Sequence, residues 1–372
     1  MTRRDWVATA ASALSVTAGA SSAPTPEARP NILLIISDQF RADNLGCLGL
    51  NPMDLTPNLD ALAARGVLFR SAMANQPVCA PARATMFTGQ YPERTGVWHN
   101  GPGLKPDAVT LASTLRQEGY TANYIGKWHL GPQSGVNIGA VPPPARGGFL
   151  DFWEASNALE RTSTAYSGEM YDGDGKPIPF SGTYRAQFLT DRATRFLREK
   201  RNREKPFLLC VSYLEVHHQN DVDRFLPPKE YEDRYQNPFV PQDLRALPGS
   251  WPSQLADYYR CVKSIDDQVG HLRQALADEG LDRNTIVVFL SDHGCHFKTR
   301  NTEYKRSPHE SSIHIPLIMS GPGFDRPTVV QELVSQVDLT PTLIEAAGAA
   351  VPSTMQGKSM LPLVRGDAAN WR

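Results

Sequence analysis

The residue types best suited to chemistry lie in one short stretch, NQPVCAPARATMFTGQYP, at residues 75–92. It places a thiol, Cys79, four residues before the cation of Arg83, with a proline between them. If a helix begins here, its unpaired N–H groups and positive dipole end would favour a bound oxyanion beside the thiol. A cysteine buried only as a small apolar residue would not require an arginine at this spacing. The stretch therefore indicates a reactive thiol in an anion-binding setting.

Titratable or polar side chains also follow four apolar runs of strand length. Because the carboxyl ends of parallel strands meet at one edge of a sheet, we expect these side chains to form one site. They are Asp38 and Gln39 after NILLIIS, Lys127 and His129 in TANYIGKWHLG, His217 and His218 after PFLLCVSYLEV, and Asp292 and His293 after TIVVFLS.

The elements that must position these residues alternate along the chain. Apolar strands such as residues 31–37 are separated by amphipathic stretches, which predict helices over 56–66, 107–119, 252–280 and 337–348. This alternation indicates the α/β class, with a mainly parallel sheet between helices on both faces. Residues 142–185 are rich in proline and glycine, and we expect them to form long loops over one edge.

Composition narrows the class of protein without naming a partner. The 372 residues are 41 % hydrophobic and 21 % charged, which is typical of a globular chain with one large core or two smaller ones. A net charge of −1 argues against a general nucleic-acid binder. The five cysteines include no C-x-x-C pair, which fits neither a disulfide framework nor a structural zinc site.

The first 29 residues have the pattern of an export signal. Arg3-Arg4 precede an alanine-rich, mildly apolar run and then small residues, as in a twin-arginine signal peptide. The apolar run is shorter than the roughly 20 residues that cross a bilayer, so we expect no stable membrane span. The prediction is a periplasmic or secreted protein whose catalytic domain is residues 30–372. The alternative is a disordered basic leader that carries no address.

The motif Cys79-Ala80-Pro81-Ala82-Arg83, with Thr88-Gly89 behind it, resembles the signature of the sulfatases in the alkaline-phosphatase superfamily. The likeness extends through NILLIISDQFRADNLGCLG, TPNLDALAARGVLFRSAMA, GKWHLG, SDHG and YKRSPHESSIHIPLI, and so covers most of residues 30–365. The resemblance implies hydrolysis of organic sulfate monoesters, either glycan or aryl sulfates. It also implies that a separate maturation enzyme oxidises the cysteine to formylglycine, which supplies the nucleophile.

The same resemblance implies a divalent metal. Its ligands would be Asp38, Gln39, Asp292, His293 and the formylglycine formed from Cys79. Many relatives have Asp where this chain has Gln39 and Asn where it has His293. Calcium prefers oxygen ligands, so these departures weaken the expectation of Ca²⁺ and leave Mg²⁺ or Mn²⁺ as alternatives.

Catalytic roles follow from the resemblance in the same way. Arg83, Lys127 and Lys305 would neutralise or hold the sulfate group. His217 would be the general acid for the leaving oxygen, with His218 as its rival, and His129 would be the base that assists release of sulfate. Two other functions stay open, namely a phosphonate or phosphate ester hydrolase of the same superfamily, and a silent binding protein in which Cys79 is unmodified.

Relatives usually continue, beyond a segment like GKSMLPLVRGDAANWR, into a smaller region with its own antiparallel sheet. We expect that region to be missing from this chain, so that apolar residues near its end, among them Leu361 and Leu363, must pack on the main domain or stay uncovered. Substrate contacts are expected from residues 96–103, 142–185 and 217–238.

Overall fold

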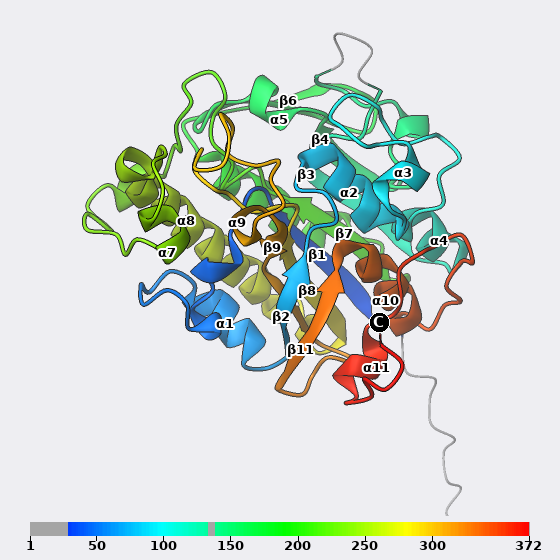
Figure 1. Ribbon diagram of the computed structural model, residues 1–372. Coiled ribbons are helices and arrows are strands. Elements are labelled where there is room, and N and C mark those ends of the chain that lie inside the picture. Colours follow the sequence, from blue (N-terminus) through cyan, green and yellow to red (C-terminus); the bar gives the residue numbers. More distant parts are fainter. Residues whose placement is uncertain (1–28, 133–137, 372) are drawn as a thin grey trace, which may run out of the picture.

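A large sheet with helices on both faces forms the centre of the molecule in the computed structural model, which describes residues 29–132 and 138–371 (Figure 1). Its eleven strands follow the order β11-β2-β10-β8-β1-β7-β3-β4-β5-β6, with the short β9 paired to β2. The strands are β1 (Asn31–Ser37), β2 (Val67–Met73), β3 (Thr121–Lys127), β4 (Phe152–Ser156), β5 (Ser167–Tyr171), β6 (Pro177–Ser181), β7 (Phe207–Ser212), β8 (Thr285–Ser291), β9 (His314–Ile315), β10 (Leu317–Ser320) and β11 (Thr328–Ser335).

The middle of the sheet is parallel. Strands β8, β1, β7, β3 and β4 run in one direction, and Ile32 of β1 pairs with Leu208 on one side and Ile286 on the other. β10 is antiparallel to both of its neighbours, and β5 and β6 form an antiparallel hairpin at one edge. The prediction of a mainly parallel α/β sheet is therefore confirmed.

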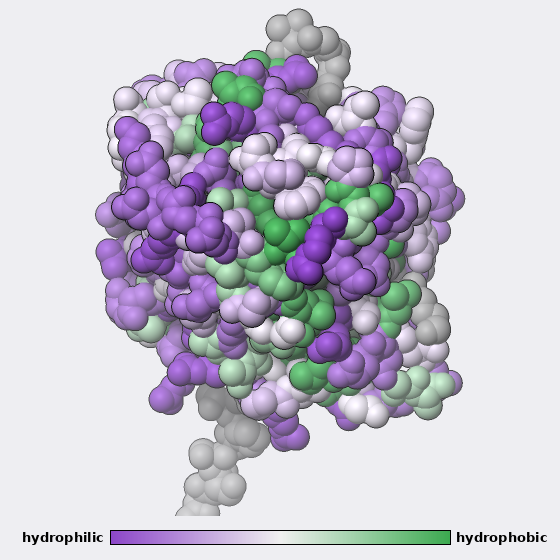
Figure 2. Space-filling model, turned by 60° about the vertical axis from the view of Figure 1, so that its left-hand side comes forward, coloured by the Kyte–Doolittle hydropathy of each residue, from purple (hydrophilic) through white to green (hydrophobic). Residues whose placement is uncertain are grey.

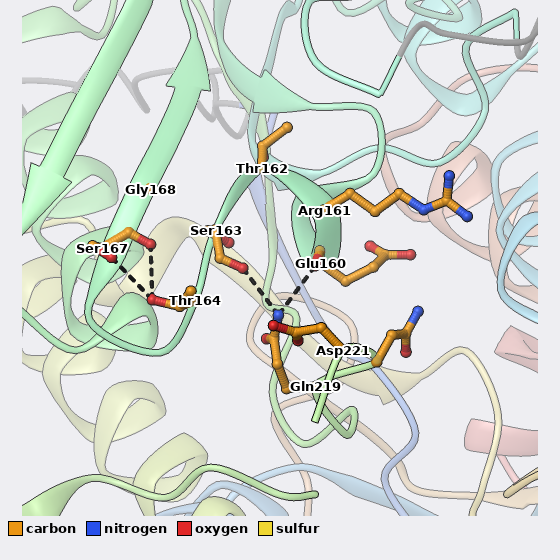
Figure 3. A pocket seen from close by; sticks show the side chains of 10 residues that line it. Glu160, Arg161, Thr162, Ser163, Thr164, Ser167, Gly168, Gln219 and Asp221 are labelled. Atoms are coloured by element: carbon orange, nitrogen blue, oxygen red, sulfur yellow. Dashed lines mark hydrogen bonds between the residues drawn. The ribbon is translucent and has the colours of Figure 1, made fainter. Parts of the chain in front are cut away.

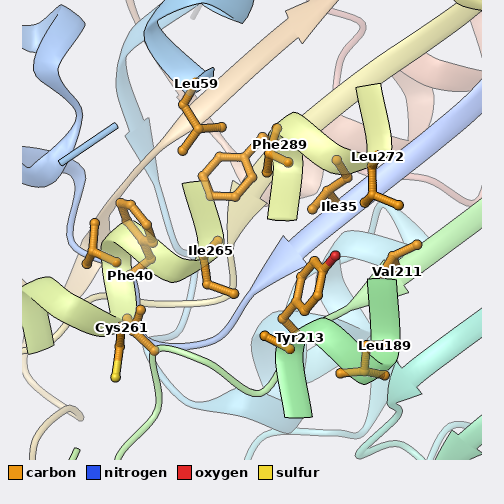
Figure 4. Close-up of a cluster of buried hydrophobic side chains, with 14 of the residues drawn as sticks. Ile35, Phe40, Leu59, Leu189, Val211, Tyr213, Cys261, Ile265, Leu272 and Phe289 are labelled. Carbon is orange, nitrogen blue, oxygen red and sulfur yellow. The ribbon is translucent and has the colours of Figure 1, made fainter. Parts of the chain in front are cut away.

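Side chains of β1 alternate between two buried cores, one on each face of the sheet. Leu33 and Ile35 pack with α1, α6 and α8, whereas Ile32 and Leu34 pack with α2, α4, α10 and α11. Figure 4 shows the first core, where Ile35 lies among side chains from helices and neighbouring strands. The helices are α1 (Pro57–Ala63), α2 (Cys79–Thr88), α3 (Pro92–Thr95), α4 (Leu111–Gln117), α5 (Leu159–Thr162), α6 (Arg185–Arg195), α7 (Gln242–Arg245), α8 (Trp251–Asp278), α9 (Glu310–Ile313), α10 (Leu339–Ala346) and α11 (Leu361–Val364).

Local chemistry explains where several helices begin. α1 and α8 carry proline in their first turn, where the missing N–H costs no intrahelical bond. α4 begins at Leu111 because Thr110 and Ser113 form a reciprocal capping box. These helices, with α10, confirm the four that the hydrophobic spacing predicts.

The expectation of long loops over residues 142–185 is wrong. This stretch contains β4, which pairs with β3 inside the sheet, and the β5–β6 hairpin, which extends the sheet at its edge. The prolines obscured the pattern, because Pro177 and Pro179 lie on β6, an edge strand where a missing N–H is tolerated.

The residues near the end of the described chain pack on the main domain. Leu361 and Leu363 of α11 are buried in the second core, and α11 contacts β11. Figure 2 shows a largely hydrophilic face, with apolar side chains gathered in a band across the middle of the view. Within the described ranges, no helix combines the length and the apolar character needed to cross a membrane. The predicted signal peptide, apart from Arg29, lies outside the described residues.

Candidate active site

The predicted residues meet at the carboxyl ends of the central parallel strands. Lys127 is the last residue of β3, Asp38 follows β1, and Asp292 follows β8. His217 lies five residues beyond the end of β7, and Cys79 is the first residue of α2. The parallel topology thus brings residues from distant parts of the chain to one edge of the sheet.

Four buried residues form a cluster that could hold a metal ion. The ligand atoms of Asp38, Cys79, Asp292 and His293 all lie within 4.8 Å of one another. Cys79 Sγ is 3.4 Å from His293 Nε2, which is 3.5 Å from Asp38 Oδ1. Two carboxylates and an imidazole suit a divalent cation, and an oxygen in place of the sulfur at position 79 would make the set harder. The donors therefore fit a divalent metal without fixing which one.

Two lysines surround the thiol. Lys305 Nζ lies 2.8 Å from Cys79 Sγ, and Lys127 Nζ lies 3.7 Å from it while donating to Asp38 Oδ2 at 2.7 Å. Burial raises the pKa of Cys79, but the charges of Lys127, Lys305 and His293 outweigh burial and hold that pKa well below its usual value. Position 79 is consequently a place where negative charge is stabilised.

Arg83 contacts two carboxylates of the cluster, whereas the resemblance implies that it contacts the sulfate group. It is fully buried and donates through Nε to Asp292 Oδ2 at 3.2 Å and through Nη2 to Asp38 Oδ2 at 3.3 Å. Its Nη1 donates to Lys127 O and Ser212 Oγ. Because four of its N–H groups donate in this way, Arg83 holds the two carboxylates in place.

The backbone amides at the start of α2 contribute less than expected. The Ala80 N–H donates to Asn100 Oδ1 at 3.0 Å, and Pro81 has no N–H to offer an anion. The positive charge around position 79 therefore comes mainly from side chains.

The predicted histidines occupy different depths of the site. His217 Nε2 lies 3.2 Å from Lys305 Nζ, so its ring faces the centre. His218 stacks on the far side of His217 and on Tyr304, with ring centroids 4.4 and 4.1 Å apart. The His129 ring also lies near the centre, since it helps to lower the pKa of Cys79. His293 belongs to the cluster itself, and of the other three predicted histidines His217 and His129 lie toward the centre.

Gln39 is adjacent to the cluster, but its amide is engaged elsewhere. Nε2 donates to Cys295 Sγ at 3.3 Å, and Oε1 lies 3.4 Å from His218 Nδ1. Its backbone has a φ of 66°, a strained value for a non-glycine residue, and its N–H donates to Asp292 Oδ1. The backbone of Gln39 thus orients a carboxylate of the cluster, whereas its role as a ligand stays a prediction.

Sequence reasoning missed Glu160, which lies beside Lys127 with 3.3 Å between Oε2 and Nζ. Glu160 follows the end of β4 closely, as the other predicted residues follow their strands. It was not recognised because β4 lies in the stretch that was interpreted as loops. Asn100 lies within residues 96–103, where substrate contacts are expected, but its hydrogen bond with Ala80 was not predicted, because a contact between a loop and a helix leaves no pattern in the sequence.

Two neighbouring pockets adjoin this region. One, of about 330 Å³, is lined by His217, His218 and Lys305 among others. The other, of about 580 Å³, includes Glu160 and Arg161, whose side chains project to the same side in Figure 3. Polar side chains dominate both pockets, and Asn220 lines both. The pockets offer a polar ligand room next to the centre.

Together, the sheet and the buried centre at its carboxyl edge define an alkaline-phosphatase-like α/β protein. The sulfatase family model matches residues 30–349, and the chain belongs to the sulfatase family. It is 31 % identical over 348 residues to an ulvan-active sulfatase of Formosa agariphila, covering 91 % of this chain and 65 % of that protein's length.

Solved structures agree with this assignment. A putative sulfatase from Bacteroides fragilis superposes with a TM-score of 0.81 at 27 % identity, over 93 % of this chain and 80 % of that one. A protein solved in complex with its substrate, D-glucosamine-2-N,6-O-disulfate, superposes with a TM-score of 0.73 at 25 % identity, over 92 % and 82 % of the two chains.

Proposed function

We propose that this chain hydrolyses organic sulfate monoesters, with formylglycine derived from Cys79 as its nucleophilic residue. The observation that supports this most directly is the cluster of Asp38, Cys79, Asp292 and His293 beside two lysines. It combines a candidate metal site and a position that stabilises negative charge in one buried centre. Membership of the sulfatase family supports sulfate ester hydrolysis as the reaction at this cluster.

Different residues of the site would bind the metal, bind the sulfate group and transfer protons. Asp38, Asp292 and His293, with position 79, would hold the divalent metal, which supplies positive charge for a sulfate oxyanion. Lys127 and Lys305 lie close enough to position 79 to contact an anion there. His217 faces the same point and can give a proton to the leaving oxygen, while His129 can accept one.

The partners and location belong to the same proposal. The metal is Ca²⁺ in the first instance, with Mg²⁺ or Mn²⁺ as the alternatives that His293 allows. A formylglycine-generating enzyme acts on the Cys-x-Pro-x-Arg motif, and residues 1–29 direct export to the periplasm or beyond. The polar pockets favour a sulfated sugar as substrate, in keeping with the substrate of the superposed complex.

The decisive experiment combines mass spectrometry of the peptide containing position 79 with paired sulfate and phosphonate ester assays. We expect formylglycine in the active protein, release of sulfate, and loss of turnover in Cys79→Ala without loss of folding. Cys261→Ala, which removes another buried thiol far along the chain in α8, is the control and should stay active.

Other results would redirect the proposal. An active protein whose Cys79 is entirely an unmodified thiol would contradict the nucleophile. Faster phosphonate than sulfate hydrolysis would favour the other hydrolase, and a correctly modified but inactive protein would favour a binding role.

A further inference from the structure

Glu160 is a buried carboxylate that the proposed mechanism leaves without a role. Its side chain is 6 % exposed, with Oε2 3.3 Å from Lys127 Nζ and Oε1 3.9 Å from His129 Nδ1. Across the described ranges, neither Glu160 Oε2 nor His129 Nδ1 has a hydrogen-bond partner. Burial raises the pKa of Glu160, but Lys127 and His129 outweigh burial and lower it to about 2, so the group is an anion near neutral pH.

The fold holds Glu160 and His129 at a fixed separation. β3 and β4 are adjacent parallel strands, and their pairing continues past the strand ends, because the Trp128 N–H donates to Ser156 O and the His129 N–H to Asn157 O. Glu160 follows three residues later, in α5. Both side chains therefore leave neighbouring strand ends and reach the same region.

The two nitrogens of the His129 ring have different surroundings. The His129 ring lowers the pKa of Cys79, which places it beside position 79, and within the described residues its Nδ1 has no hydrogen-bond partner. Nδ1 faces the Glu160 carboxylate. A carboxylate on one side of an imidazole favours the tautomer that carries its hydrogen on that side, and leaves the other nitrogen free to accept a proton.

We propose that Glu160 is a positioning residue that holds the His129 ring with Nδ1–H toward its carboxylate and the Nε2 lone pair toward position 79. The proposal rests on the proposed function in one respect, that His129 acts as a base there. The separation of 3.9 Å between Glu160 Oε1 and His129 Nδ1 is longer than a hydrogen bond, and a small rotation of the ring would close it.

The first test reads the tautomer directly and needs no turnover. Long-range ¹⁵N–¹H spectra of the full chain, labelled at its nine histidines, show which ring nitrogen of His129 carries hydrogen, with the signals assigned by His129→Gln. We expect Nδ1–H in the wild type and a shift toward Nε2–H in Glu160→Gln. Unchanged His129 signals in Glu160→Gln would overturn the proposal.

Glu154→Gln is the matched control. Glu154 lies on β4, its side chain is also 6 % exposed, and it pairs with Arg192 rather than with the centre. It should lower stability without moving the His129 signals. An equal shift of those signals in both variants would mean a general structural effect and would also overturn the proposal.

The second test separates kcat from KM on a sulfate ester that the wild type hydrolyses. Glu160→Gln should lower kcat by about tenfold or more with KM changed less than about threefold, and Glu160→Asp should recover part of the loss. In a His129→Ala background, Glu160→Gln should have little further effect on kcat. Equal losses in both backgrounds would sink the idea. A wild type without sulfatase activity would instead refute the proposed function, while the spectra still decide the role of Glu160.

Discussion

His217 and His218 are adjacent in sequence, and their surroundings separate them. His217 Nε2 lies 3.2 Å from Lys305 Nζ, while its Nδ1 lies 2.5 Å from the backbone oxygen of His218. His218 lies between the rings of His217 and Tyr304. Burial lowers the pKa of His218, and the neighbouring His217 and Lys305 lower it further, so a proton is hard to place there. His217 is therefore the better candidate for the general acid.

Replacing each histidine by alanine should therefore give different patterns. His217→Ala should lower kcat/KM for alkyl sulfates by about 10²–10⁴, and much less for activated aryl sulfates, because only poor leaving groups need protonation. His218→Ala should affect both substrate types to a similar, smaller extent through lost packing. The measurement is kcat/KM for the two ester types in each variant. A leaving-group dependence found in His218→Ala instead would move the acid role to His218.

Residues at strand ends could be predicted from the sequence, because polar residues after an apolar run mark the edge where sites form. Asp38, Lys127 and Asp292 were found this way. The partners of Arg83 could not be predicted from the sequence, since an arginine near a thiol can contact either a bound anion or neighbouring carboxylates. Only the three-dimensional arrangement shows that it holds Asp38 and Asp292.

Strand β3 depends on a glycine just before Lys127. Gly126 has a φ of +106°, and a Cβ built there would lie 2.1 Å from Ser212 O on β7. The strand can approach β7 this closely only without a side chain at that position. Lys127, the next residue, therefore owes its place beside Asp38 to this close approach.

Gly126→Ala should consequently lower the free energy of unfolding by more than about 3 kcal/mol, because the backbone must move and the φ is unfavourable. Gly119→Ala is the matched control, since Gly119 precedes the same strand with a φ of +87° and open space around it. It should cost only about 1–2 kcal/mol. Urea unfolding of both variants measures the difference. Similar losses in the two would show that the contact with Ser212 does not limit the strand.

Long periodic elements were predictable, whereas short edge elements were not. The 28 residues of α8 give many turns of hydrophobic spacing, so its existence follows from the sequence. β4, β5 and β6 have only five residues each, and β6 also contains two prolines, so their pattern is too short to separate from a loop. Glu160 was therefore not predicted as a site residue, because a strand end must be recognised before the residues that follow it can be interpreted.

The buried centre joins the central sheet to helix α2. Asp38 and Asp292 extend from two central strands, while Cys79 begins a helix that packs on one face. In this structure, burial and the charge of Asp38 raise the pKa of Asp292, even though His293 and Arg83 oppose them. Two buried carboxylates this close repel each other, and a divalent cation between them would remove that repulsion.

A metal that binds only the folded protein should therefore raise its melting temperature. At about 100 times the dissociation constant, the gain is about 2.7 kcal/mol, or roughly 3–4 °C for a chain of this size. Differential scanning calorimetry of chelator-treated protein with added Ca²⁺, Mg²⁺ or Mn²⁺ would rank the three metals without relying on turnover. Asp292→Asn should lose most of the shift, while Asp266→Asn, which removes a buried carboxylate on α8, should keep it. If Asp292→Asn responds as strongly as the wild type, the cation binds elsewhere. In that case the charges of the two buried carboxylates would be balanced mainly by the two buried cations that contact them, Arg83 and Lys127.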